Sequence, residues 1–130
     1  MLDHLSIPVS DIERSKSFYQ KTLNPLGYKL VKDMGKVVSF GIEDGPLSSR
    51  DPGGEFWIYQ GKATPCLAVH FAFSAASHHL VDEFYHAAIA AGGTDNGKPG
   101  LREHYHPHYY AAFVRDPDGY NIEAVFHCVK

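Results

Sequence analysis

The chain has 130 residues, of which 44% are hydrophobic, and it carries a formal net charge of −3 at pH 7. The length and the hydrophobic fraction predict one compact domain. The negative net charge and the scattered Lys and Arg residues argue against binding to nucleic acid or to an anionic membrane. The sequence has no bilayer-spanning apolar run, no secretory signal pattern, and only two cysteines, so we expect a cytoplasmic protein.

The first half of the chain predicts the order strand, helix, strand, strand, strand. Ser10 and Glu13 have the spacing of a capping box at the start of the helix, and Pro25 and Gly27 end it. Strand-like composition covers residues 2–9, 28–31, 36–42 and 55–59. This half is therefore interpreted as a βαβββ unit over about residues 1–61.

The second half, about residues 65–128, repeats this order. A helix is predicted from about Ser77 to Ala91, and residues 94–100 are predicted to be a loop. The sequence from Asp116 to Gly119 has the proline and glycine positions of a type I turn between the last two strands. Strand-like composition covers residues 66–73, 102–105, 109–115 and 120–127.

The two halves match at a constant offset of 66 positions. The identical pairs at this offset are His4 and His70, Phe18 and Phe84, Tyr19 and Tyr85, and Gly27 and Gly93. A match at a fixed offset is typical of one supersecondary unit used twice, whose copies bury each other's apolar faces. We therefore predict an α+β fold in which two tandem βαβββ modules form a cupped mixed sheet within a single domain, residues 1–130.

Three strand residues are candidate metal ligands. A lone histidine in a strand is usually packed or hydrogen-bonded, but His4 and His70 are equivalent positions that a pseudo-twofold axis would bring to one central space. Glu123 lies in the apolar strand 122–126, where a carboxylate is costly unless it is paired or binds a metal. The alternative for Glu123 is a strand face that meets solvent. Its counterpart at the same offset is Trp57, which is not a ligand.

Three segments carry a resemblance to a known family. They are His4-Leu5-Ser6-Ile7-Pro8-Val9 with Asp11 and Ser17-Phe18-Tyr19, then Val69-His70-Phe71-Ala72-Phe73, and then Asp116-Pro117-Asp118-Gly119-Tyr120-Asn121-Ile122-Glu123. In this order they resemble the vicinal oxygen chelate superfamily, which groups glyoxalase I, extradiol dioxygenases, fosfomycin-resistance enzymes and bleomycin-resistance proteins. The resemblance implies paired modules around a divalent metal, and His4, His70 and Glu123 match three of the ligand positions.

The fourth ligand position departs from glyoxalase I. Trp57 stands there, or Ile58 if the alignment shifts by one residue, and Glu55 on the same strand face as Trp57 is an alternative ligand. Two imidazoles and one carboxylate leave about half of an octahedral shell open, which suits a substrate that chelates through two neighbouring oxygens. Fe, Mn, Zn and Ni ions all tolerate this ligand set.

The stretch 102–110, rich in histidine and tyrosine, is a candidate pocket wall. Arg102 could hold an anionic substrate group, and Tyr105, His106 or Tyr110 could transfer a proton near neutral pH. A partly exposed strand entrance and a second metal site are the alternatives, although Pro107 disfavours the latter. Trp57 is expected either to line the cavity opposite Glu123 and contact an apolar part of the substrate, or to pack under the first helix.

Two functions follow from these predictions. The first is a metal-dependent enzyme of lyase, dioxygenase or transferase type that acts on a small molecule. The second is a metal-free protein that sequesters a small molecule, in the manner of bleomycin-resistance proteins. The three ligand-type residues favour the enzyme, because a pure binding pocket does not need a buried carboxylate between two imidazoles. The resemblance also implies a homodimer.

Overall fold

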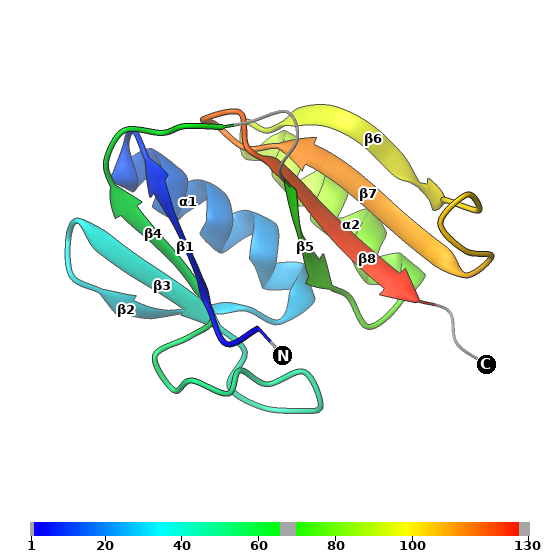
Figure 1. Ribbon diagram of the computed structural model, residues 1–130, viewed down its shortest axis with the longest axis horizontal. Coiled ribbons are helices and arrows are strands. Elements are labelled where there is room, and N and C mark those ends of the chain that lie inside the picture. Colours follow the sequence, from blue (N-terminus) through cyan, green and yellow to red (C-terminus); the bar gives the residue numbers. More distant parts are fainter. Residues whose placement is uncertain (1, 66–69, 128–130) are drawn as a thin grey trace.

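The structure, a computed structural model, describes residues 2–65 and 70–127. Its elements in chain order are β1 (Leu5–Val9), α1 (Ile12–Leu23), the short 3-10 helix η1 (Asn24–Leu26), β2 (Lys29–Asp33), β3 (Val37–Gly41), β4 (Phe56–Gln60), β5 (His70–Ser74), α2 (His78–Ala90), β6 (Thr94–Leu101), β7 (Tyr109–Arg115) and β8 (Asn121–His127). They form two four-stranded sheets, in the orders β1-β4-β3-β2 and β5-β8-β7-β6 (Figure 1). The predicted α+β fold of two βαβββ modules is confirmed, and each module forms its own sheet.

Both sheets are mixed, because each contains one parallel pair of strands, and in each sheet this pair includes an edge strand. β1 pairs in parallel with β4, and β5 pairs in parallel with β8, while the other neighbours are antiparallel. β1 and β5 are therefore edge strands, and Figure 1 shows them at the junction of the two sheets, running in opposite directions. None of the helices in the described part of the chain is long and apolar enough to cross a membrane.

An aromatic core joins the two modules. Phe56 of β4 contacts Tyr19 of α1, with ring centroids 4.9 Å apart, and also contacts Phe73 of β5 at 5.2 Å. Tyr28, next to β2, contacts Phe73 edge-on at 5.4 Å. Because these side chains are almost fully buried, the two modules share one hydrophobic core rather than two separate ones.

The predicted capping box at the start of α1 is wrong by one residue. Asp11 is the N-cap, and its side chain accepts a hydrogen bond from the Arg14 backbone N–H. Ser10 instead donates its hydroxyl to Asp118 of the second module, and Glu13 pairs with Lys16. Both Ser10 and Asp11 are good caps, so the tertiary contact of Ser10 decides between them.

The second module differs from the prediction at its outer edge. Residues 94–101 form β6 rather than a loop, and residues 102–105, predicted to be a strand, form a turn. β6 contains Gly97 and Pro99, which an edge strand tolerates, and two register shifts interrupt its pairing with β7. The helix prediction is confirmed with Ser77 as its N-cap, whereas residues 66–69 of the predicted strand 66–73 lie outside the described residues.

The turn between β7 and β8 fastens the second module to the first. The buried Tyr19 hydroxyl donates to Asp116 Oδ2, and Asp116 Oδ1 accepts the backbone N–H groups of Asp118 and Tyr120 at 2.9 Å. The Tyr120 hydroxyl in turn donates to the Pro8 carbonyl at 2.8 Å. Both oxygens of the buried Asp116 carboxylate therefore have donors, and in the part of the chain that the structure describes the donor to Oδ2 is a residue of the other module.

Tyr19→Phe is expected to reduce the free energy of unfolding by about 1–3 kcal/mol, because it leaves Asp116 Oδ2 buried without a donor. Burial raises the pKa of Asp116 and the Tyr19 hydroxyl lowers it, so the variant raises this pKa further. A raised aspartate pKa favours the native state at low pH and disfavours it as pH rises. The loss should therefore be larger at neutral pH than at roughly pH 4.

Urea unfolding at the two pH values measures this loss. Tyr85→Phe is the matched control, since Tyr85 occupies the duplicated position and faces the exposed Asp95, and it should lose much less stability. Equal losses in the two variants, or a Tyr19→Phe loss that grows on acidification, would contradict the assigned role of the Tyr19 hydroxyl.

Candidate functional site

His70 and Glu123 come together on the open face of the second sheet. The parallel register of β5 and β8 sets Ala72 opposite Glu123, two residues along from His70. Ile122 and Ala124 are fully buried in the core, so strand alternation directs Glu123 to the opposite face. The two side chains meet there, with His70 Nε2 3.3 Å from Glu123 Oε1.

Glu123 has a buried carboxylate, and one of its two oxygens lacks a hydrogen-bond partner among the described residues. Its side chain is fully buried, whereas that of His70 is 48% exposed. Oε2 accepts a hydrogen bond from the Tyr109 hydroxyl, but Oε1 has no hydrogen-bond partner among the described residues. Burial raises the pKa of Glu123, while the Tyr109 hydrogen bond and His70 lower it. A buried carboxylate oxygen facing an accessible imidazole suits a bound cation, because burial without a partner is costly.

Tyr109 is the residue that sequence reasoning missed. It opens β7, and burial together with its hydrogen bond to Glu123 raises its pKa, so at neutral pH the phenol is a hydrogen-bond donor. In the β7–β8 register, Tyr109 lies opposite His127 and Phe113 lies opposite Glu123, which puts both aromatic residues on the Glu123 face. The residue type was visible in the sequence, but choosing between Tyr109 and its neighbour required this register.

Tyr110, named as a proton-transfer candidate, faces the other way. Its hydroxyl donates to Asp82 of α2 at 2.7 Å, and its ring stacks on His78 with centroids 3.9 Å apart. Burial and the Asp82 hydrogen bond raise its pKa to about 12. Tyr110 therefore connects β7 to the helix and is not brought to the His70 and Glu123 pair.

The other candidates of the 102–110 stretch lie around Tyr109. Its ring centroid is 4.7 Å from that of Tyr105 and 5.4 Å from that of His106. The Arg102 guanidinium lies 5.4 Å from the ring centre of Phe113 and donates to the carbonyls of its own segment. These placements are compatible with a pocket wall beside Glu123, and the individual roles stay predictions.

His4 is not brought to His70 and Glu123 within one chain. Its Nδ1 lies 2.8 Å from Asp3 Oδ1. Within residues 2–65 and 70–127, the one group of three potential ligands whose atoms lie within 4.8 Å of one another is Asp3, His4 and Asp51. The expected convergence fails because His4 precedes β1 and His70 begins β5, and these antiparallel strands start at opposite ends of the junction (Figure 1).

The candidates for the fourth ligand position are held by local hydrogen bonds. Trp57 alternates with the buried Phe56 and Ile58, so it does not pack under α1, and its Nε1 donates to the Gly54 carbonyl at 3.0 Å. The Glu55 carboxylate accepts the hydroxyls of Tyr28, at 2.6 Å, and of Ser49, at 2.7 Å. A contact between Trp57 and a substrate stays a prediction.

Comparisons with known proteins agree with this architecture. The family model described as Glyoxalase/Bleomycin resistance protein/Dioxygenase superfamily matches residues 1–124. A glyoxalase/bleomycin resistance protein from Albidiferax ferrireducens is 32% identical over 95% of this chain and 96% of that chain, with a TM-score of 0.77.

Two further solved structures are similar. A putative glyoxalase from Bacillus halodurans is 26% identical over 97% of this chain and 95% of that chain, with a TM-score of 0.67. The fosfomycin resistance protein FosX from Listeria monocytogenes is 20% identical over 97% and 92%, with a TM-score of 0.70. No curated protein matches the chain.

Proposed function

The chain belongs to the glyoxalase/bleomycin resistance protein/dioxygenase superfamily, and on this premise we propose that it is a metal-dependent enzyme acting on a small molecule that chelates the metal through neighbouring oxygens. The observation that carries the proposal is the buried Glu123 Oε1, which has no hydrogen-bond partner among the described residues and lies 3.3 Å from His70 Nε2. Two ligand atoms about 2.1 Å from one ion, at angles of about 90–110°, are separated by about 3.0–3.4 Å. The observed separation therefore fits two ligands of one ion.

His70 and Glu123 would hold a divalent ion, which when bound would act as a Lewis acid on the substrate oxygens. Tyr109 donates to the second oxygen of Glu123 and so fixes the direction of the carboxylate, as hydrogen bonds to metal ligands commonly do. In this proposal Tyr105 or His106 exchanges a proton with the substrate, and Arg102 holds an anionic group. Exchange by His106 requires it to give up a present contact, because its Nε2 lies 2.9 Å from His127 Nδ1 and its Nδ1 accepts the His108 backbone N–H.

The third ligand in this proposal is His4 of a second copy of the chain. The side chain of His4 is 54% exposed and that of His70 is 48% exposed, so both imidazoles are accessible from outside the protomer. A twofold dimer is self-complementary: if His4 of one protomer meets His70 and Glu123 of the other, the same contact forms twice. The dimer would then contain two equal sites. The rival arrangement is the single-chain group of Asp3, His4 and Asp51.

Mixing two variants distinguishes these arrangements. His4→Ala and His70→Ala are each expected to lose tight binding of Ni(II) or Mn(II), measured by calorimetry after chelator treatment. When the two variants are mixed in equal amounts and allowed to exchange subunits, about half of the dimers are mixed and each contains one complete site, so roughly a quarter of wild-type binding should return.

Each other outcome has a distinct meaning. If both variants lose metal and mixing restores nothing, the site does not span two protomers. Full metal binding by His70→Ala favours the Asp3, His4 and Asp51 group and contradicts the proposed site. A wild-type protein that takes up no divalent ion contradicts the enzyme proposal and supports metal-free sequestration of a small molecule.

A further inference from the structure

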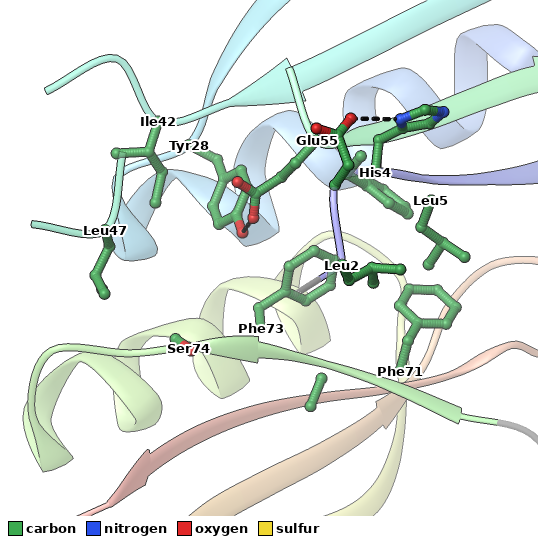
Figure 2. Close-up of a pocket in the computed structure, with 13 residues that line it drawn as sticks. Leu2, His4, Leu5, Tyr28, Ile42, Leu47, Glu55, Phe71, Phe73 and Ser74 are labelled. Carbon is green, nitrogen blue, oxygen red and sulfur yellow. Dashed lines mark hydrogen bonds and ion pairs between the residues drawn. The ribbon is translucent and has the colours of Figure 1, made fainter. Parts of the chain in front are cut away.

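A cavity of about 190 Å³ lies at the junction of the two modules (Figure 2), and its lining residues include neither His70 nor Glu123. Segments from both modules line it, the start of β1 on one side and residues 71–74 of β5 on the other. Most of its wall is apolar: Leu5, Tyr28, Ile42, Phe56, Phe71 and Phe73. The rings of Tyr28 and Phe71 each meet Phe73 nearly edge-on, which gives the cavity a rigid aromatic side.

The polar residues that line this cavity are Asp3, His4, Glu55 and Ser74, and Asp3 and His4 contact each other, with Asp3 Oδ1 2.8 Å from His4 Nδ1. The Glu55 carboxylate is the one that the aromatic wall surrounds. The Glu55 carboxylate accepts hydrogen bonds from two neutral hydroxyls, those of Tyr28 and Ser49. Burial, together with the hydrogen bond to Glu55, raises the pKa of the Tyr28 phenol, which stays protonated. Among the described residues, no lysine, arginine or histidine forms an ion pair with Glu55. Asp3 adds a second carboxylate at the rim. The negative charge of Glu55 is thus oriented by its neighbours without being neutralised.

We propose that this cavity binds the ammonium end of a small primary alkylamine. A carboxylate beside aromatic rings attracts an organic cation both by its charge and through the negative faces of the rings. The cavity volume equals about six water molecules at roughly 30 Å³ each, which accommodates a short alkylammonium group but no drug-sized ligand. The aliphatic wall of Leu5 and Ile42 contacts the alkyl chain, so the ligand needs both a charged end and an apolar stem.

Titration with n-butylammonium chloride, followed by amide NMR shifts, tests this site. EDTA is present throughout, so no metal ion is bound at His4, which lines the cavity, or at His70 and Glu123 during the titration. Saturable shifts are expected at the amides of Tyr28, Phe71 and Phe73. Butanoate, which has the opposite charge, and 1-pentanol, which has none, should bind at least about tenfold more weakly. Absence of saturation by n-butylammonium, or equal binding of the three compounds, overturns the proposal.

Three variants test which side chains contribute to the binding of n-butylammonium. Glu55→Gln is expected to weaken n-butylammonium binding about tenfold or more, and Phe71→Leu about two- to fivefold, because leucine keeps the apolar contact without the aromatic face. Glu43→Gln is the matched control: Glu43 is exposed and outside the cavity, and its loss changes the net charge equally, so binding should stay within about twofold. Native amide spectra confirm folding of each variant. If Glu55→Gln binds as tightly as Glu43→Gln, the ammonium assignment is wrong.

Discussion

Glu123→Gln is expected to lower the affinity for a divalent ion by at least about 100-fold and to leave the metal-free protein as stable as the wild type or more stable. The variant removes the proposed charged ligand, because a neutral amide oxygen is a much weaker ligand than a carboxylate. It also removes a charge whose pKa burial already raises and whose Oε1 has no hydrogen-bond partner among the described residues. The same substitution therefore separates metal binding from folding.

Calorimetric titration with Ni(II) and urea unfolding in EDTA measure the two effects. The control Glu83→Gln alters an exposed carboxylate on α2 whose ion-pair partner within residues 2–65 and 70–127 is His79, and it should change neither quantity appreciably. Tyr109→Phe should have an effect between those of Glu123→Gln and Glu83→Gln, with a loss of about 10- to 100-fold in metal affinity. The variant keeps the Glu123 carboxylate but removes the hydrogen bond that orients it. A Glu123→Gln protein that is strongly destabilised without metal would show that the carboxylate serves the fold instead.

Gly54→Ala is expected to reduce the free energy of unfolding by about 3–5 kcal/mol, the largest stability effect that we predict for a single methyl group. Gly54 has φ of +100°, and a Cβ atom there would lie 2.7 Å from the Phe40 carbonyl oxygen. Left-handed backbone costs a non-glycine residue about 1–2 kcal/mol, and the contact with backbone adds to this because β3 cannot move aside. The residue also precedes Glu55, so the variant should weaken n-butylammonium binding.

Gly45→Ala measures the cost of the left-handed backbone alone, without a steric contact. Gly45 has a similar φ of +96°, but a Cβ atom there would have no neighbour within 4 Å, so a loss of about 1–2 kcal/mol is expected. Urea unfolding of both variants at one pH gives the difference, which measures the contact with Phe40. Equal losses would mean that the loop relaxes and that the approach of Gly54 to β3 is not rigid.

The repeat made much of the fold predictable. An offset that matches His4 to His70 and Tyr19 to Tyr85 requires two copies of one unit, and the strand and helix patterns give that unit's order. The loop predicted for residues 94–100 is instead part of β6, because Gly97 and Pro99 are typical of loops but an exposed edge strand accepts both. Local composition does not reveal whether a segment lies at an edge.

The candidate site was predictable only in part. Strand pairing alone brings His70 to Glu123, and both were visible as polar residues in strands. The position of His4 depends on how the two modules are turned relative to each other, about which a repeat offset carries no information. The choice of Tyr109 over Tyr110 depends on hairpin register, where a shift of one residue exchanges the two faces.

The hydrogen bond between Tyr19 and Asp116 also has a consequence for how the chain acquires its structure. The two residues are 97 positions apart, so α1 completes the bonding of its buried phenol only after most of the chain has been synthesised. Tyr85, at the duplicated position, faces Asp95 of its own module instead. The symmetry of the sequence is thus broken at the two tyrosines: Tyr85 meets its carboxylate within its own module, whereas the Tyr19 hydroxyl meets its acceptor only when the second module is present.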